Sequence, residues 1–410
     1  MRLRGALGNL ALAVFSVVLV LLALEGALRV ARKRQGSGKE EATLDRYSQR
    51  DPVLGWRKRP GARATYNRRE YRVEVVINSL GLRDPERGYE AAPGTFRVLA
   101  LGDSFVEGYT VPLPSTTTQV LEKSLASPGC PVEVVNGATS AYSTDQEYLF
   151  YREEGFRYGP KVVILFFYYN DVYFNTVGSY FGSPKPRLSF RGPRPEPRRE
   201  VAEPDPLETR PAELEAPPSG SALFAWVRER LVRGAPRTYG ALARLGLWEP
   251  IREVPPRTEM KVYKRKPTPE IEKGWELTRR ILEALSDEAA SHGARLVVVY
   301  VPSRLEVRDA DWELTRIQYG LDEKWDRGLV LERLGGIAGA AGIPLLDLTP
   351  ALRREERGAL GGPYYRYDGH WNALGHRVAA RELRAFLGGL KVLPPCVEPA
   401  TDKPLEPRGR

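Results

Sequence analysis

The sequence contains few of the side chains that build metal centres or disulfide scaffolds. Its 410 residues include 2 cysteines and 3 histidines. Cys130 and Cys396 are too few for a disulfide scaffold or a Cys-rich zinc site, and their wide separation matches no metal-ligand spacing. One disulfide outside the cytoplasm and two free thiols both agree with this count. We therefore expect neither a metal ion nor a cofactor.

A nucleic-acid-binding motif is also missing, although the formal net charge is +10. A basic domain can attract phosphate without a motif, but these basic residues are spread along the chain and form no recognised module. Solvated helix faces and attraction to anionic lipid explain them more simply. We expect no nucleic-acid partner.

The chain has one long apolar run. Residues 6–24 carry no charged side chain and are just long enough to cross a bilayer, which takes about 20 residues. No clear small-residue cleavage site follows, so the pattern predicts that residues 1–35 are an uncleaved, single-pass membrane anchor. More basic residues follow the run than precede it, and the positive-inside rule alone would place the rest of the chain in the cytoplasm.

Short apolar runs alternate with helical segments from residue 96 onward. The predicted strands are Phe96–Leu101, Val132–Val135, Val162–Phe167, Arg295–Val301 and Ile343–Leu348. The predicted helices cover residues 115–128, 144–156, 270–292, 325–341 and 373–389. Near-continuous apolar strands separated by helices are typical of a parallel sheet covered on both faces. We therefore expect one doubly wound α/β domain with five strands over residues 96–390.

Three segments lie outside this predicted core. Residues 36–95 suggest a stalk, or an add-on to the core, with a small β extension, because the sequence from Tyr71 to Asn78 alternates with a period of two. Residues 391–410 form a tail. The insert at 172–269 is rich in proline and charge, so we expect much of it to be extended or disordered.

An amphipathic helix is predicted inside the insert, within residues 221–247. Such a helix can act as a lid or lie on a membrane, or it can simply pack on the domain. We favour simple packing.

The first chemical motif is Gly-Asp-Ser at residues 102–104, directly after the first core strand. Catalytic groups in open α/β sheets collect at the carboxyl ends of strands, which makes Ser104 a candidate nucleophile. A helix N-cap is the structural alternative for this serine. An α/β-hydrolase nucleophile elbow is excluded, because Phe105 and Val106 follow Ser104 where that motif requires Ser-x-Gly.

The second motif is Asp368-Gly-His370, ahead of the last predicted helix. A serine nucleophile needs a base, and the base needs a carboxylate that fixes its tautomer. His370 and Asp368 supply both groups. His292 ends a predicted helix and is expected to be structural, whereas His376 is expected at the surface of the last helix. Asp368, His370 and His376 have no recognisable metal-ligand spacing.

Two further motifs follow the other core strands. Asn170 comes after the third strand, where its side-chain amide can donate to an oxyanion. Gly137 comes after the second strand and can present a backbone N–H to the same place. Asn-Asp and Asn-Gly are also common turn pairs, so the evidence comes from their combination with Ser104 and His370.

The order and spacing of these four blocks resemble the SGNH (GDSL-like) hydrolase family. The resemblance covers roughly residues 96–171 and 270–390. It implies a flavodoxin-like three-layer α/β/α sandwich, with Ser104 as nucleophile, His370 as base and Asp368 as its partner. It also implies that the Ser104 amide, the Gly137 amide and the Asn170 side chain line the oxyanion hole.

Two departures from the family pattern are visible. Tyr168 stands where the family has the glycine of Gly-x-Asn-Asp, and would narrow the pocket. Asp-Gly-His stands where the family usually has Asp-x-x-His. Together with Trp371, this form is similar to that of the alginate O-acetyltransferase branch, whose members are tied to the membrane and act on exported polysaccharide. Trp371 would suit sugar stacking, although core packing is an equal alternative. By this analogy we expect a catalytic domain outside the cytoplasmic membrane, in the periplasm.

Arg304, just past the fourth strand, is a candidate ligand for a carboxylate or an acyl donor. The simpler interpretation, which we favour, is a surface arginine without a binding role.

The expected activity is that of a serine esterase that forms an acyl-enzyme on an O-acetyl or other ester of carbohydrate or lipid. An O-acyltransferase that moves the acetyl group to polysaccharide hydroxyls is the first alternative. A non-catalytic, membrane-tethered glycan-binding or assembly protein is the second.

Overall fold

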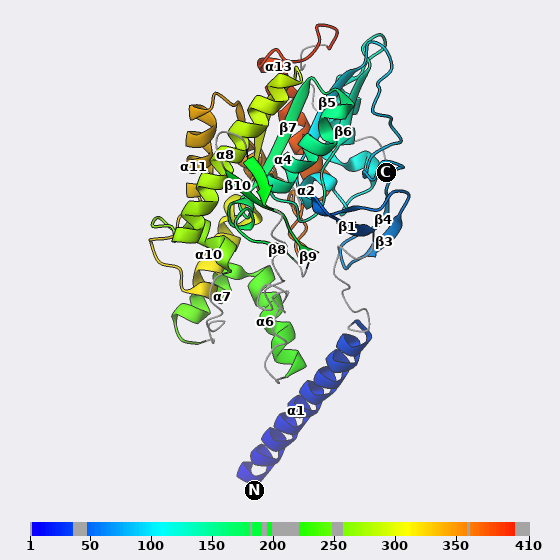
Figure 1. Ribbon diagram of the computed structural model, residues 1–410. Helices are drawn as coiled ribbons and strands as arrows, with labels where there is room; N and C mark the ends of the chain where they lie inside the picture. The colour runs from blue at the N-terminus through cyan, green and yellow to red at the C-terminus, as the bar shows by residue number, and fades with distance from the viewer. Residues whose placement is uncertain are drawn as a thin grey trace.

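The fold is built around a five-stranded parallel sheet in the order β13-β12-β7-β5-β6 (Figure 1). The computed structural model describes residues 2–35, 47–180, 183–190, 195–198, 221–247, 257–358 and 361–397. The strands are β5 (Phe96–Leu101), β6 (Val132–Asn136), β7 (Val162–Tyr168), β12 (Arg295–Val301) and β13 (Leu345–Asp347). This is the flavodoxin-like order, so the predicted fold class and all five strands are confirmed.

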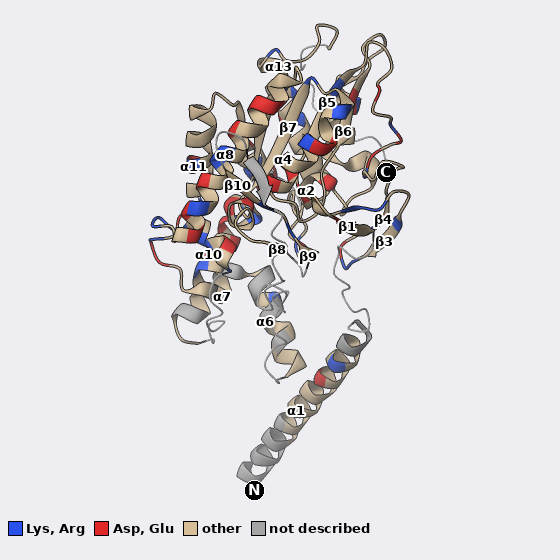
Figure 2. Cartoon of the chain, in the orientation of Figure 1, with Lys and Arg blue, Asp and Glu red and all other residues tan. Residues whose placement is uncertain are grey.

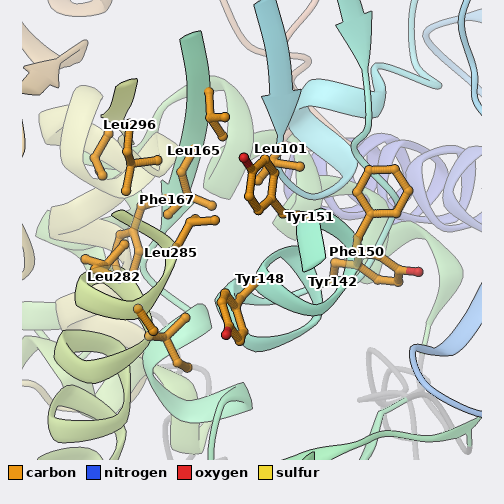
Figure 3. Close-up of a cluster of buried hydrophobic side chains, with 14 of the residues drawn as sticks. Leu101, Tyr142, Tyr148, Phe150, Tyr151, Leu165, Phe167, Leu282, Leu285 and Leu296 are labelled. Carbon is orange, nitrogen blue, oxygen red and sulfur yellow. The ribbon is translucent and has the colours of Figure 1, made fainter. Parts of the chain in front are cut away.

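The strands are apolar throughout because both faces of the sheet are covered. Alternate residues such as Leu99 and Leu165 pack in one cluster, and their neighbours Val98 and Ile164 pack in another. The helices that cover the first cluster are α4 (Thr144–Glu153), α8 (Pro269–Ser291) and α11 (Leu329–Ala340). The helices that cover the second cluster are α3 (Thr117–Leu125), α12 (Thr349–Gly358) and α13 (Ala373–Gly389). Figure 3 shows Leu101, Leu165 and Phe167 of the sheet facing Leu282 and Leu285 of α8. The result is a three-layer sandwich.

The predicted core helices are present, with ends that differ by a few residues. Sequence reasoning missed α10 (Asp309–Tyr319) and α12, as well as three one-turn helices, α2 (Ser104–Glu107), α5 (Asp171–Phe174) and α9 (Arg304–Val307). Both α10 and α12 are short and rich in charged residues, so neither contains the apolar run that marked the other core elements.

The strand order places the candidate motifs at one edge of the sheet. The chain passes from β5 to β6 on one side and then crosses to β7 on the other side of β5. Ligand sites in such sheets lie where the connections diverge, outside the carboxyl ends of the strands. Ser104 follows β5 and Asn170 follows β7, so both flank this point.

Residues 47–95 pack on the core and do not extend from it as a stalk. β1 (Ser48–Asp51) pairs with β2 (Gly55–Lys58), and β3 (Arg63–Asn67) pairs with β4 (Arg72–Val76), the strand expected from the alternating pattern. Tyr66, Tyr71 and Val75 of the second hairpin share a buried cluster with Tyr109 of the core. The hairpin is therefore fixed beside the serine turn.

The insert contains more secondary structure than its composition suggests. β8 (Ser179–Tyr180) pairs with β9 (Ser183–Pro184), and β10 (Arg187–Phe190) pairs with β11 (Pro195–Arg198). These residues are extended, as one branch of the expectation has it, and they are ordered, because buried Leu188 anchors β10 to the core. Residues 199–220 and 248–256 lie outside the described part of the chain.

The amphipathic segment of the insert forms α6 (Ala222–Gly234) and α7 (Pro236–Arg244). α7 packs against α10, and α6 packs against α1 (Arg2–Gln35). The side chain of Glu25 on α1 accepts hydrogen bonds from Ser221 Oγ, the Ala222 N–H and the Leu223 N–H. These contacts agree with the interpretation that the insert helices pack on other parts of the chain.

The predicted transmembrane anchor is not supported. Within the ranges that the structure describes, α1 included, no helix combines the length and apolar character needed to cross a membrane.

Charges of both signs are mixed on the α8 side of the sandwich (Figure 2). Arg279 pairs with Glu276 and Glu283 along α8, and Arg333 of α11 pairs with Glu272 of α8. Arg279 and Arg333 are thus matched by neighbouring carboxylates.

Candidate active site

The serine motif forms a tight turn between β5 and α2. Ser104 is the first residue of α2, and the Asp103 side chain accepts a hydrogen bond from the Phe105 N–H at 2.8 Å. A Cβ at Gly102 would lie 2.7 Å from Val106 Cγ2 and 3.2 Å from Phe166 Cβ, so only glycine fits this close approach. The turn presents Ser104 at the carboxyl end of β5.

The three residues expected to form a triad make one continuous hydrogen-bond chain. Ser104 Oγ lies 2.8 Å from His370 Nε2, and His370 Nδ1 lies 2.5 Å from Asp368 Oδ1. The side chains of His370 and Asp368 are 23% and 19% exposed, so the site is open to a substrate. Nucleophile, base and orienting carboxylate are thus in the relative positions that the chemistry needs.

The departure from Asp-x-x-His to Asp-x-His is accommodated by Gly369. This residue has a φ of +87°, a conformation that residues with a Cβ rarely adopt. The turn brings the Asp368 carboxylate beneath the imidazole of His370, and the same carboxylate also accepts from the His370 N–H at 3.3 Å. One intervening residue therefore suffices when it is glycine.

The electrostatics around His370 make it a stronger base. Burial lowers the pKa of His370, but the hydrogen bond and negative charge of Asp368 outweigh burial, and the net effect is a raised pKa. Burial raises the pKa of Asp368, yet its hydrogen bonds from His370 and Tyr71 hold that pKa at about 2. Asp368 is therefore ionised and stabilises the imidazolium form of His370.

Two of the three expected oxyanion donors are placed where they can bind an oxyanion. The Ser104 N–H opens α2, where helix donors have no partner within the helix. Asn170 lies at the N-cap of α5 without a capping bond, and its side-chain oxygen has no hydrogen-bond partner among the described residues. Both donors are placed at the switch point of the sheet.

Gly137 does not have a free donor. Its backbone N–H donates to the Ala100 carbonyl at 2.9 Å. A Cβ at this glycine would lie 2.7 Å from Phe150 Cε1 and 3.1 Å from Leu99 Cδ1. We therefore correct the expected role: Gly137 allows close packing of the loop after β6, and its amide is already used.

The three candidate substrate-binding residues have different positions. Tyr168 packs against the Phe105 ring at 4.8 Å between centroids and lies beside the nucleophile turn. Trp371 is fully buried and packs on Phe105, so stacking on a sugar is excluded for it. Arg304 Nη1 donates to the Tyr365 and Arg366 carbonyls, and its Nε pairs with Asp311. Arg304 therefore holds the loop before Asp368, and its guanidinium is paired with Asp311.

The two other histidines are structural. His292 stacks on Phe156 at the end of α8, as expected. The expectation that His376 lies at the surface is wrong, because this residue is buried and its Nδ1 lies 2.9 Å from Thr117 Oγ1. Burial lowers the pKa of His376 to about 3. A joint metal site with Asp368 and His370 is not formed, because His376 faces α3.

Sequence reasoning missed a group of contacts from the N-terminal segment. The Tyr71 hydroxyl donates to Asp368 Oδ2, and the Glu70 carboxylate accepts from the Arg366, Tyr367 and Asp368 N–H groups. At the end of α2, Glu107 accepts from Tyr47 and from the Ser140 N–H. No local pattern marks these residues, since their partners are distant in the sequence.

Comparison with protein families matches the C-terminal part of the chain. Residues 259–394 match the family described as "SGNH hydrolase-like domain, acetyltransferase AlgX". The matched segment includes Asp368 and His370, whereas Ser104, Gly137 and Asn170 precede it. A search of curated protein sequences finds no match.

Solved structures similar to this chain include two hydrolases. The lipase/acylhydrolase from Enterococcus faecalis is 11% identical; the match covers 75% of this chain and 99% of that chain, at a TM-score of 0.35. A mutant of Axe2, an acetyl-xylooligosaccharide esterase from Geobacillus stearmophilus, is 12% identical; the match covers 72% of this chain and 94% of that chain, at a TM-score of 0.38. At such low similarity these structures add no argument about the site.

The family match confirms the resemblance to the SGNH hydrolases, near their AlgX acetyltransferase branch. Residues 259–394 match an SGNH hydrolase-like domain, and this match supports an enzyme of the ester hydrolase or O-acetyltransferase type.

Proposed function

We propose that the chain is a serine esterase that forms an acyl-enzyme on Ser104 and acts on an O-acetyl ester of a carbohydrate or lipid. The observation that carries this proposal is the hydrogen-bond chain from Ser104 through His370 to Asp368. Serine hydroxyls with such partners are activated nucleophiles. The acetyl group is suggested by the acetyltransferase in the description of the matching family.

The reaction has two half-reactions. His370 Nε2 takes the proton of Ser104 Oγ as this oxygen attacks the ester carbonyl, and Asp368 stabilises the resulting imidazolium. The Ser104 N–H and the Asn170 amide stabilise the oxyanion. Collapse breaks the bond to the alcohol, which leaves with the proton from His370. Water, deprotonated by His370, then attacks the acyl-enzyme and restores Ser104.

Transfer to another hydroxyl is the alternative outcome of the second half-reaction. A sugar hydroxyl in place of water would make the enzyme an O-acyltransferase, and the family match favours keeping this alternative. The outcome depends on how well the acyl-enzyme is shielded from water. A non-catalytic glycan-binding role is less well supported, because all three triad side chains are present and hydrogen-bonded.

The proposed location is outside the cytoplasm, in the periplasm. Cys130 and Cys396 form a disulfide with Cα atoms 5.6 Å apart. Disulfides persist in oxidising compartments and are rare in the cytoplasm. The disulfide supports the location expected by analogy with enzymes of exported polysaccharide.

The test uses the full chain and a fluorophosphonate probe, together with hydrolysis of a short-chain aryl acetate. Wild type, Ser104→Ala and His370→Ala are compared, with circular dichroism to confirm folding. We expect labelling and hydrolysis in wild type and loss of both in the variants. Folded wild-type protein that is not labelled would overturn the serine-nucleophile mechanism and favour the glycan-binding alternative.

A second measurement separates hydrolysis from transfer. The acetylated enzyme is mixed with a soluble oligosaccharide, and released acetate is compared with acetylated sugar by mass spectrometry. Acetate as the main product supports the esterase. A predominance of acetylated sugar supports the transferase.

A further inference from the structure

The Asp368 carboxylate has a second partner besides the histidine. Its Oδ1 contacts His370, and its Oδ2 accepts a hydrogen bond from the Tyr71 hydroxyl at 2.7 Å. Tyr71 comes from the N-terminal hairpin, outside the segment that matches the family. Each carboxylate oxygen is thus bound from a different side, which fixes the rotation of the carboxylate.

The backbone that carries Asp368 is held by the residue next to Tyr71. The Glu70 carboxylate accepts from three successive N–H groups, those of Arg366 at 2.7 Å, Tyr367 at 2.7 Å and Asp368 at 3.0 Å. Hydrogen bonds to a charged acceptor are about twice as strong as neutral ones. One carboxylate therefore holds three consecutive peptide units of the catalytic loop.

The hairpin that supplies both residues is itself rigid. Tyr71 is 8% exposed and lies in the buried cluster with Tyr66, Val73 and Tyr109. Its ring also packs on Tyr365, with centroids 5.0 Å apart. A side chain held in this way can impose its geometry on the loop that it contacts.

We infer that Glu70 and Tyr71 are positioning residues of the esterase, which orient Asp368 and through it His370. This inference rests on the proposed function, because it assigns the two residues to the same triad. The Tyr71 hydroxyl also withdraws negative charge from Asp368. Its loss makes Asp368 a stronger acceptor for the His370 Nδ1–H and stabilises the imidazolium.

The principal test is Tyr71→Phe, which removes one hydroxyl and keeps the ring. We expect kcat for the aryl acetate to fall about 10- to 100-fold, since a misplacement of about 1 Å can cost about 100-fold. KM should stay unchanged, and the acid limb of the kcat/KM profile should move to higher pH. The matched control is Tyr158→Phe, which removes a hydroxyl that donates to Glu154 far from the triad and should leave kcat and the pH profile as in wild type.

Glu70→Gln provides a second variant. The amide nitrogen of glutamine would face backbone N–H groups that need an acceptor, so the loop at 366–368 should lose part of its anchor. We expect a lower kcat and slower fluorophosphonate labelling, with one Ser104 still labelled per chain. Glu74→Gln is the control, because Glu74 pairs with exposed Arg63 on the same hairpin.

A readout independent of turnover is the low-field proton resonance of the His370 Nδ1–H, recorded on the full chain below the pKa of His370. Its position should change in Tyr71→Phe and stay constant in Tyr158→Phe. An unchanged resonance together with unchanged kcat in Tyr71→Phe would overturn the positioning role. A resonance that shifts in Tyr71→Phe, while the wild-type chain is not labelled by the probe, would instead support the positioning role and reject the proposed esterase.

Discussion

Lys58 Nζ lies 3.9 Å from Glu107 Oε2, and neither side chain has any exposed surface. Glu107 is in the same helical turn as Ser104, and Lys58 also donates to the Ala138 carbonyl and to Thr139 Oγ1. The ammonium group therefore joins the N-terminal segment to the loops that follow β5 and β6. Burial lowers the pKa of Lys58 to about 8, although Glu107 opposes this shift.

Lys58→Met should destabilise the fold strongly. The substitution leaves the Glu107 carboxylate buried without its cation, which typically costs about 3–5 kcal/mol. Urea unfolding monitored by tryptophan fluorescence measures the change. Lys324→Met is the matched control, because Lys324 pairs with Asp322 at the surface and should cost at most about 1 kcal/mol. Equal losses in both variants would contradict a structural role for the buried pair.

Asn170→Ala should remove an oxyanion donor. We expect kcat for the aryl acetate to fall about 100- to 1,000-fold with little change in KM, because the interaction forms in the transition state. Steady-state kinetics test this, and thermal unfolding should show nearly wild-type stability, since the side chain makes no capping bond and its oxygen has no partner among the described residues. A raised KM with an intact kcat would argue that Asn170 contributes only to substrate binding.

Gly137→Ala should act on stability and leave the chemistry intact. The added methyl group would lie 2.7 Å from the Phe150 ring, and such overpacking typically costs about 1–3 kcal/mol. The N–H of residue 137 already bonds to Ala100, so kcat per folded molecule should remain close to wild type at low temperature. A selective loss of kcat in a fully folded variant would restore Gly137 to the oxyanion hole.

The pH profile should report the raised pKa of His370. Only neutral His370 can take the serine proton, so kcat/KM should fall as the pH drops through a pKa above the ordinary value of 6.5. Asp368→Asn removes the charge that raises this pKa, and the acid limb should then move to lower pH while kcat drops by about 10,000-fold. An acid limb at the same pH in both proteins would mean that another group controls the profile.

The disulfide between Cys130 and Cys396 should contribute to stability without affecting catalysis. It spans 266 residues of sequence, and native disulfides typically contribute about 2–5 kcal/mol. The double variant Cys130→Ser/Cys396→Ser should have a lower unfolding midpoint than wild type. Its midpoint should equal that of wild type treated with dithiothreitol. Wild type that does not respond to the reductant would show that the two thiols are not paired.

Local patterns predicted the sheet well and the surroundings of the site poorly. The five strands are apolar because both of their faces are buried, and Ser104, Asp368 and His370 are found because each sits in a short motif. Glu70 and Tyr71 belong to no such motif. Tyr71 begins the alternating stretch and Glu70 comes just before it, and their partners are almost 300 residues away. The candidate sugar-stacking role of Trp371 failed for a related reason, because a residue's type does not say whether its side chain faces the pocket or the protein interior.

The contact between Tyr71 and Asp368 joins residues 297 positions apart. A ribosome adding about 5–20 residues per second needs roughly 15–60 s to pass from one to the other. During that time the hairpin has no catalytic loop to hold, and Ser104 has no base. Each nascent chain is therefore inert until the loop just ahead of its last helix has been made, and esterase activity reports that synthesis has passed that point.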